Sequence, residues 1–350
     1  MNFITIDKKD WAPGIDQSRQ TFRVYGPVED ENGCQIKPLA PDTPPKMDAA
    51  VTVMSAKSVL FPQTEKILTA TLDESKQDHH VMKPVETDDM PRVVLGIRPY
   101  DAKAMHLVKL NFDNPDYKDP YWCAAYDATT FVGLGVTRPG PCDFSTAAGC
   151  GPFSEEGLDV LMADMDDTYL AKILTEKGEK WAAACGFDTV ADPKESQVLF
   201  DVLRKEAEKQ IQADVNTDKL AGKTILDLYD APFWDEVAFS CINCGTCTYV
   251  CPTCWCFDIQ DETRHNTAVR FRNWDTCMSP LFTHHASGHN PRGTKVQRVR
   301  QRFMHKLKYF LDKYDQGIMC VGCGRCVASC PVNIDIREVC NRMNDYETTK

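Results

Sequence analysis

Several common functional signatures are absent from this 350-residue sequence. It has no run of 18 apolar residues, which excludes a membrane-spanning helix of ordinary length. No glycine-rich dinucleotide fingerprint, phosphate-binding loop or nucleophile elbow is present, and Gly133-Leu-Gly135 is too short to count as one. The net charge of −11 argues against nucleic acid as a general partner. The sequence therefore offers no motif for substrate chemistry.

A secretory signal is also missing from the start of the chain. The first residues, MNFITIDKKDW, lack the charged segment and apolar stretch of a signal peptide. We therefore expect a cytoplasmic protein with no membrane partner, in a compartment where thiols stay reduced.

Cysteine, in contrast, is abundant, and eight of the 17 cysteines occur in two runs of identical spacing. The runs are Cys241-x2-Cys244-x2-Cys247-x3-Cys251-Pro252 and Cys320-x2-Cys323-x2-Cys326-x3-Cys330-Pro331. A 2-2-3 spacing followed by proline is typical of bacterial [4Fe–4S] sites. Two copies predict two [4Fe–4S] clusters.

The expected ligand sets cross between the two runs. In two-cluster ferredoxins, the cysteine before the proline ligates the cluster of the other run. One cluster is therefore predicted to take Cys241, Cys244, Cys247 and Cys330, and the other Cys320, Cys323, Cys326 and Cys251. Glycines within the runs suit a loop that bends tightly and brings backbone N–H groups near the sulfurs.

Two other uses of cysteine fit the spacing less well. Structural zinc sites usually have two separated cysteine pairs, and here four cysteines follow each other twice. Disulfide frameworks belong to small secreted chains, whereas this chain is long. The spacing therefore favours iron–sulfur clusters, which pass single electrons.

Three further cysteines follow the first run. Cys254 and Cys256 lie in CPTCWCFD, and Cys277 lies in WDTC. They could contribute to a third cluster, although a fourth ligand is not obvious. We favour the interpretation that they are buried thiols near a cluster, because free cysteine is commonly buried.

The segment between the two runs is unusually basic. Residues 263–308 contain ten lysines and arginines, one acidic residue and five of the eight histidines. His284, His285 and His289 could bind a metal, but surface positions are the simpler interpretation. The basic residues could be solvated, meet an acidic partner, or bind the phosphates of a flavin or pyridine nucleotide held by a neighbouring subunit.

The remaining pattern predicts an α+β protein of two domains. Residues 1–228 are expected to form an α/β domain. Its strands are expected near 51–54, 93–97 and 131–136, with a strand pair at 158–162 and 169–174. Its helices are expected at 101–110 and 193–212. Residues 27–50 are expected to form a loop. Asp192 and Thr294 are expected to cap the helices that follow them, and the helix at 193–212 is expected to bury Leu199, Val202, Leu203 and Ile211. Residues 229–350 are expected to form a mainly helical ferredoxin-like domain, because 68 residues separate Cys251 from Cys320 and apolar residues recur at helical spacing from Val296 to Tyr314.

Four stretches of the second domain carry a family resemblance. They are CINCGTCTYVCPTCWCFD, RNWDTC, FTHHASGHNPRGTKVQRVRQRFMHK and CVGCGRCVASCPVNIDI. They resemble the iron–sulfur electron-transfer component that sulfhydrogenases (as their beta subunit) share with anaerobic sulfite reductases. The likeness is strong over residues 234–340 and continues more weakly through LFPQTE, GIRPYDAKA and GCGPFSEEGLDVLMAD.

The resemblance implies a relay between subunits. Members of this family transfer electrons between a flavin- and NAD(P)-binding partner and a catalytic or electron-accepting partner. The complexes are of the hydrogenase, sulfite reductase or heterodisulfide-reductase type. The eight cysteines of the two runs match the family's ligands. The family typically has cysteine where Tyr100 stands and a cysteine-rich stretch around 137–144, where only Cys142 occurs here. We therefore expect an additional cluster of the family to be lost and the first domain to act as a docking platform.

Two other functions stay open at this stage. The chain could be a self-contained reductase with a flavin or substrate site in its first domain. It could also be a non-catalytic redox sensor or scaffold whose clusters regulate binding.

Overall fold

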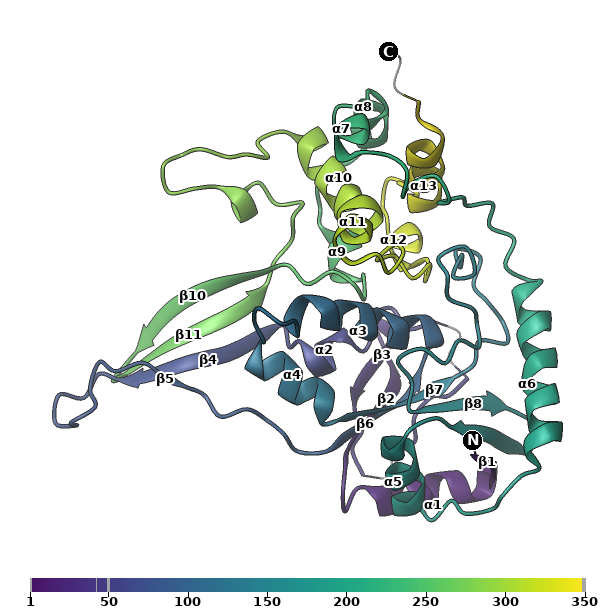
Figure 1. Cartoon of the computed structure of the whole chain (residues 1–350). Coiled ribbons are helices and arrows are strands. Elements are labelled where there is room, and N and C mark those ends of the chain that lie inside the picture. Colours follow the sequence, from purple (N-terminus) through teal and green to yellow (C-terminus); the bar gives the residue numbers. More distant parts are fainter. Residues whose placement is uncertain (1, 42, 49–50, 348–350) are drawn as a thin grey trace.

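A seven-stranded mixed sheet organises the first half of the chain in the computed structural model, which describes residues 2–41, 43–48 and 51–347 (Figure 1). The strand order is β1-β9-β8-β7-β6-β2-β3. The parallel centre comprises β2 (Arg23–Asp30), β6 (Arg92–Ile97), β7 (Thr129–Leu134) and β8 (Val160–Asp164). Antiparallel strands border it: β3 (Gly33–Pro38), β9 (Thr168–Ile173) and β1 (Asn2–Asp7).

The central strands are buried on both faces, as a parallel sheet requires. Alternate residues of β6 enter different cores: Val94 faces one, and Val93 and Leu95 face the other. Helices α3 (Pro99–Phe112), α4 (Pro120–Asp127) and α6 (Pro193–Glu208) cover the first face. Helices α1 (Lys8–Ser18) and α5 (Glu176–Cys185) cover the second (Figure 1).

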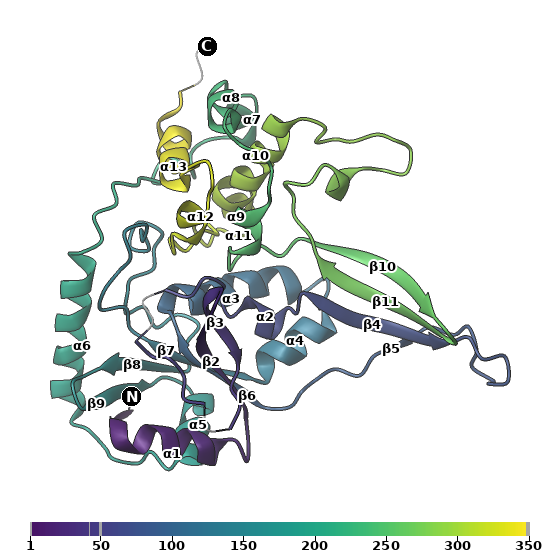
Figure 2. The ribbon, with the colours of Figure 1, turned by 180° about the vertical axis from the view of Figure 1, so that it is seen from behind.

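A second sheet joins segments that are far apart in the sequence. Its order is β10-β11-β4-β5, with β4 (Thr64–Thr71) and β5 (Lys83–Pro84) from the first half, and β10 (Phe257–Arg264) and β11 (Thr267–Trp274) from between the cysteine runs. All pairings are antiparallel. The sheet projects from the body of the molecule (Figure 2).

The cysteine runs lie among short helices around a third core. These helices are α7 (Ile225–Tyr229), α8 (Phe233–Ala238), α9 (Thr246–Tyr249), α10 (Lys295–Met304), α11 (Phe310–Tyr314), α12 (Arg325–Ala328) and α13 (Ile336–Asp345). A π-helical turn, His305–Tyr309, connects α10 to α11. Trp234, Phe303 and Met343 are among the side chains buried in this core.

Several predicted elements are confirmed. The strand at 93–97, the helix near 101–110 and the strand pair after 158 correspond to β6, α3 and β8–β9. Asp192 caps α6 by accepting hydrogen bonds from the N–H groups of Lys194 and Glu195, both at 2.9 Å. Thr294 caps α10 in a capping box. The mixture of sheets and helices agrees with the predicted α+β class.

Other predicted elements are wrong or incomplete. The stretch 27–50 is not one loop, because β2 and β3 form a hairpin there; residues 42 and 49–50 lie outside the described residues. The expected strand at 51–54 is only a single bridge between Met54 and Gln35. In α6 the buried residues are Ser196, Phe200 and Ala207, while Val202 is exposed. The mainly helical character expected for residues 229–350 is not confirmed, because the β10–β11 hairpin lies within them.

No helix in the described part of the chain is long and apolar enough to cross a membrane.

A buried ion pair fastens the first half to the second cysteine run. Arg325 donates to both carboxylate oxygens of Asp101, at 2.6 and 2.7 Å, and both side chains are only 2% exposed. The same guanidinium donates to the carbonyl and hydroxyl oxygens of Thr52, at 2.7 and 2.8 Å. Each guanidinium nitrogen therefore has a partner inside the protein.

We predict that Asp101→Ala lowers the free energy of unfolding by about 3–5 kcal/mol, because it leaves the buried Arg325 charge without its partner. Urea denaturation followed by circular dichroism measures the change. As a matched control, Glu206→Ala removes the exposed partner of Lys209 and should change the value by less than about 0.5 kcal/mol. Equal losses in the two variants would contradict the prediction.

Candidate metal centre

The two cysteine runs adopt the same backbone shape. In the first run, Asn243 and Gly245 have positive φ angles of 57° and 78°; in the second, Gly322 and Gly324 have 70° and 72°. A short helix follows each turn, and these helices, α9 and α12, pack against each other. A Cβ on Gly324 would lie 2.4 Å from the Cys142 carbonyl oxygen, so this glycine also allows the first half to approach the run.

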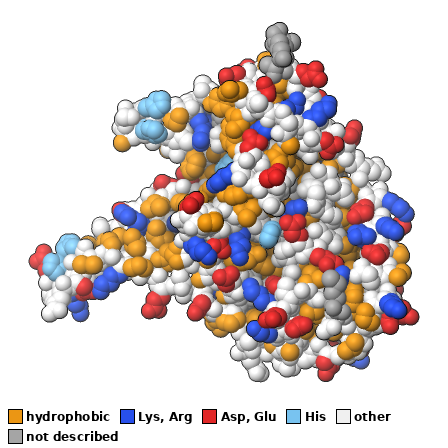
Figure 3. All heavy atoms as spheres, viewed as in Figure 1, with side chains coloured by type: hydrophobic (Ala, Val, Ile, Leu, Met, Phe, Trp, Pro, Cys, Tyr) orange, Lys and Arg blue, Asp and Glu red, His pale blue; other side chains and the backbone are white. Residues whose placement is uncertain are grey.

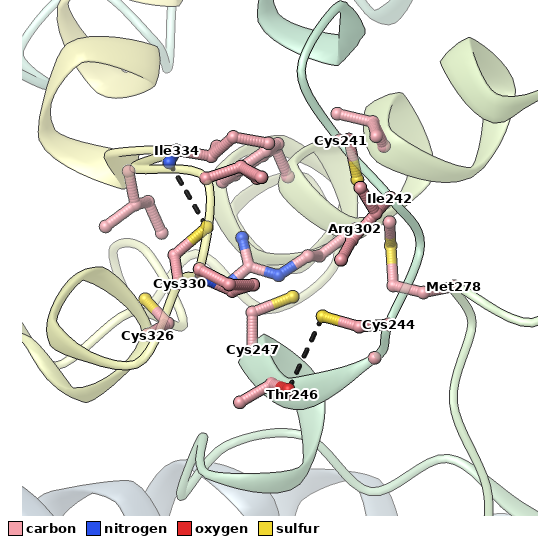
Figure 4. Close-up of a pocket in the computed structure, with 16 residues that line it drawn as sticks. Cys241, Ile242, Cys244, Thr246, Cys247, Met278, Arg302, Cys326, Cys330 and Ile334 are labelled. Atoms are coloured by element: carbon pink, nitrogen blue, oxygen red, sulfur yellow. Dashed lines mark hydrogen bonds between the residues drawn. The ribbon is translucent and has the colours of Figure 1, made fainter.

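The first cavity brings together cysteines from both runs. Its lining includes Cys241, Cys244, Cys247 and Cys330, and also Cys326 (Figure 4). Apolar residues of α10 and α13, Val299 and Ile336, surround the sulfurs. Cys244 is exposed, whereas the other four are partly buried. This cavity therefore lies near the surface.

The second cavity lies deeper and mirrors the first. It is lined by Cys320, Cys323 and Cys326 of the second run and by Cys251, the last cysteine of the first. Phe144 of the first half closes one side. The two cavities thus group three cysteines of one run with the last cysteine of the other, and Cys326 borders both.

Polar groups that suit a cluster surround the sulfurs. Backbone N–H groups of Asn243 and Ile334 donate to Cys241 Sγ and Cys330 Sγ, at 3.4 and 3.2 Å. The Thr246 hydroxyl lies 3.4 Å from Cys244 Sγ and lowers the pKa of that thiol. Such contacts stabilise negative charge on sulfur, and hydrogen bonds to cluster sulfurs tune the reduction potential. The residues present therefore fit anionic clusters.

A buried arginine lies between the two cavities. Arg302 lines both of them, and Figure 4 shows its guanidinium among the labelled cysteines. Its Nε and one Nη are buried without a hydrogen-bond partner. Burial opposes its charge, but thiolates at Cys247 and Cys326 hold the pKa of Arg302 well above its usual value. A buried cation with unused donors requires compensating negative charge, which a cluster with thiolate ligands supplies.

Two lysines surround the end of the first run. Lys306 donates to the Thr253 hydroxyl at 2.6 Å, and the neighbouring thiolates, Cys251 first, raise its pKa against the effect of burial. Lys57 of α2 (Lys57–Leu60) donates to the carbonyl oxygens of Tyr249, Cys251 and Cys254 at 3.1–3.3 Å. Burial lowers the pKa of Lys57 to about 8. The first half thus contributes a cation beside the second cavity.

These positions correct the expected location of the basic residues. Arg272, Arg298, Arg300, Arg302, Lys306 and Lys308 are all at most 9% exposed, so they do not form an outer basic surface. The pattern of apolar residues from Val296 to Tyr314 correctly predicted a helix here, which is α10 with its continuation through the π-helical turn into α11. The pattern did not predict that arginine and lysine side chains are buried beside the cysteines.

The positions linked by the resemblance to a further cluster, which we expect to be lost, are occupied by packed side chains. Tyr100 is 1% exposed, with no partner for its hydroxyl, and lies over Arg325 at 5.7 Å from the ring centroid to Cζ. Cys142 packs on Gly324, and the Phe144 N–H donates to the Gly322 carbonyl at 2.9 Å. This stretch therefore packs directly against the second run.

The other cysteines and the histidines that the sequence suggested as ligands lie outside the two cluster cavities. Cys254, Cys256 and Cys277 line a third cavity. Cys251 raises the pKa of Cys254, and Cys277 lowers that of Cys256. His284, His285 and His289 lie in an exposed loop after β11, and they belong to no site for a single metal ion among the described residues.

Comparison with known proteins agrees with this site. Residues 240–334 match the model of the 4Fe-4S dicluster domain. The match and the two sets of cysteines support the prediction of two [4Fe–4S] clusters, and the chain is an iron–sulfur electron-transfer protein.

A full-length relative is known. The chain is 27% identical over 351 residues to sulfhydrogenase 2 subunit beta of Pyrococcus furiosus, with 99% of each chain covered. This similarity confirms the resemblance seen in the motifs, including its weaker part in the first half. No solved structure matches the chain.

We predict that Arg302→Met makes the reduction potentials of both clusters more negative, because it removes a buried positive charge between them. A change on the order of 100 mV corresponds to one charge about 8 Å away at an effective dielectric constant of about 20. Redox titration followed by electron paramagnetic resonance measures it.

Arg300→Met is the matched control for this variant. Arg300 lies on the same helix, but its guanidinium stacks on the Tyr229 ring at 3.5 Å and donates to the Tyr229 carbonyl, away from the cysteines. Its loss should leave both potentials within about 20 mV, a small fraction of a single-charge effect. A shift in the reduction potential of only one cluster in the Arg302 variant would contradict the position of Arg302 between the two clusters.

Proposed function

We propose that this chain is the electron-transfer subunit of an oxidoreductase complex and relays single electrons through two [4Fe–4S] clusters. The observation that carries the proposal is the pair of adjacent cavities that share Cys326 and Arg302. Neighbouring redox centres whose cavities share lining residues suit electron transfer. The sequence contains no motif for substrate chemistry. The relative's name, which describes it as one subunit, supports a place in a larger complex.

The ligand assignment follows the predicted crossing. Cys241, Cys244, Cys247 and Cys330 would hold the cluster near the surface, and Cys320, Cys323, Cys326 and Cys251 the deeper one. When bound, these groups supply reversible one-electron storage. Arg302 and Lys306 balance the negative charge, and the apolar residues around the sulfurs exclude water.

The exposed side of the first cavity supports one contact with a partner protein. Ile242, which lines the same cavity as the exposed Cys244, is 62% exposed, and Phe239, three residues before Ile242, is 84% exposed. Exposed apolar residues beside a redox centre suit a protein–protein contact. Electrons would enter or leave the chain here.

The two ends of the path would lie in other subunits. We propose a flavin- and NAD(P)-binding subunit on one side and a catalytic or electron-accepting subunit on the other, in a cytoplasmic complex of the hydrogenase, sulfite reductase or heterodisulfide-reductase type. Residues 1–228 would serve as the docking platform and residues 229–350 as the cluster domain. The buried Tyr100 supports a first half without a further cluster.

Protein purified without oxygen should contain about eight irons and eight acid-labile sulfides per chain, as two four-iron clusters require. Iron and sulfide assays together with zinc analysis measure this. Bound zinc with almost no iron would refute the proposal.

Cys251→Ala should remove or alter the cluster held by Cys320, Cys323 and Cys326, because the replaced sulfur belongs to that set. The other cluster should keep its signal in electron paramagnetic resonance. Cys254→Ala, three residues away, is the matched control and should keep both clusters. Selective loss of the cluster near Cys244 in the Cys251 variant would show that the ligands do not cross.

A further inference from the structure

A third cavity lies beside the cluster sites and contains cysteines that neither cluster uses. Its volume is about 330 Å³, and its lining includes Cys254, Cys256 and Cys277. Phe257 at the start of β10 and Phe282 of the 3-10 turn Leu281–Thr283 also line it. Figure 3 shows the surface hollowed between the two projections that carry these segments. The cavity is thus open to small molecules from solvent.

Two of these cysteines form a pair at the base of the β10–β11 hairpin. The Asp275 N–H donates to the Cys256 carbonyl at 3.0 Å, which holds the two strand ends together. Cys277, two residues farther on, lines the same cavity, and its thiol and backbone N–H lower the pKa of Cys256. Cys256 is partly exposed, whereas Cys277 is 7% exposed. Cys256 is therefore the more exposed residue of the two.

The surroundings give the two sulfurs different chemistry. The hydrogen bonds from Cys277 lower the pKa of Cys256 to about 7, with a further contribution from the Lys306 charge. The pKa of Cys277 is raised, because its thiol donates to Cys256 and is buried. An accessible thiolate beside a buried protonated thiol is the usual arrangement of an attacking and a resolving cysteine.

The lining favours negatively charged ligands. Arg292, Arg302 and Lys306 contribute to it, and no acidic residue does among the described residues. Asp275, which raises the pKa of Cys256, accepts a hydrogen bond from the Thr276 N–H at 2.6 Å through its carboxylate. Trp255, Phe257 and Phe282 provide apolar contact surface. An anionic small molecule with an apolar part fits this composition.

We propose that Cys256 and Cys277 form a redox-active dithiol that reduces an anionic low-molecular-weight disulfide in this cavity. Cys256 thiolate attacks one sulfur of the disulfide R–S–S–R, forming a mixed disulfide and releasing one RS⁻. Cys277 then loses its proton and attacks the Cys256 sulfur, which releases the second RS⁻ and forms the Cys256–Cys277 disulfide. Two electrons and one proton return the pair to its starting thiolate and thiol.

The electrons have a short route to this pair, a step that rests on the proposed relay. Cys254, in the same cavity, shifts the pKa of Cys251, a proposed ligand of the deeper cluster. Lys306 is electrostatically coupled to both Cys251 and Cys256. The cavity therefore borders the relay, and the two clusters would deliver the electrons one at a time.

The test uses the full chain with its clusters, and glutathione disulfide as the anionic probe. Peptide mass spectrometry should find a Cys256–Cys277 disulfide in the wild-type protein. Cys277→Ser should trap a glutathione adduct on Cys256, whereas Cys256→Ser should form neither product. Cys123→Ser, which changes a partly exposed cysteine of α4 outside the cavity, is the matched control and should react as the wild type does. The cationic disulfide cystamine should react about tenfold more slowly, because the cavity is cationic.

Electron counting provides a second readout. The oxidised wild-type protein should take up about four electrons per chain, two for the clusters and two for the disulfide, and Cys256→Ser about two. An unmodified Cys256 in the Cys277 variant would overturn the dithiol proposal. An iron content above eight per chain in the wild type that falls to eight in Cys256→Ser would also overturn it, because it would show that Cys256 ligates a third cluster. Absence of iron from every variant would instead refute the relay, which separates the two failures.

Discussion

The structure depends on one electrostatic constraint: many sulfur atoms that must carry negative charge lie inside the protein, and each group of them needs positive charge within reach. Arg302 meets this need between the two cluster cavities, and Lys306 and Lys57 meet it at the end of the first cysteine run. Burying such cations alone would be strongly unfavourable, as would burying the thiolates alone. The cysteines and the basic residues thus require each other.

The same constraint explains why the two halves are tightly joined. Lys57 comes from the first half and binds carbonyl oxygens of the first run, while Asp101 and Thr52 satisfy Arg325 of the second run. Arg272 of β11 pairs with Glu65 and Asp119 of the first half. Each run is therefore held from the side of the seven-stranded sheet, which makes this protein different in construction from a free two-cluster ferredoxin. The first half positions the centres that the second half contains.

The sequence predicted the cysteine sets and several elements, because these are local signals. A 2-2-3 spacing, the Asp192 cap and the buried β6 strand can all be recognised within a dozen residues. The β10–β11 hairpin was missed since its pairing with β4 depends on residues about two hundred positions away, and its strands carry many charged side chains. The basic residues of α10 were placed on an outer surface because a charge pattern does not reveal a buried counter-charge. Likewise, the contact between Cys256 and Cys277 depends on the hairpin that brings them together.

The shared four-stranded sheet also has a consequence for the order in which the protein is made. During synthesis β4 leaves the ribosome long before β11, its neighbour in the sheet, exists. Until then the edge of β4 has only the two-residue strand β5 beside it, and an unpaired edge invites association with other chains. The first cysteine run appears just before the hairpin, and the second only after it. The nascent chain therefore has to be kept apart from its neighbours until nearly the whole sequence has emerged.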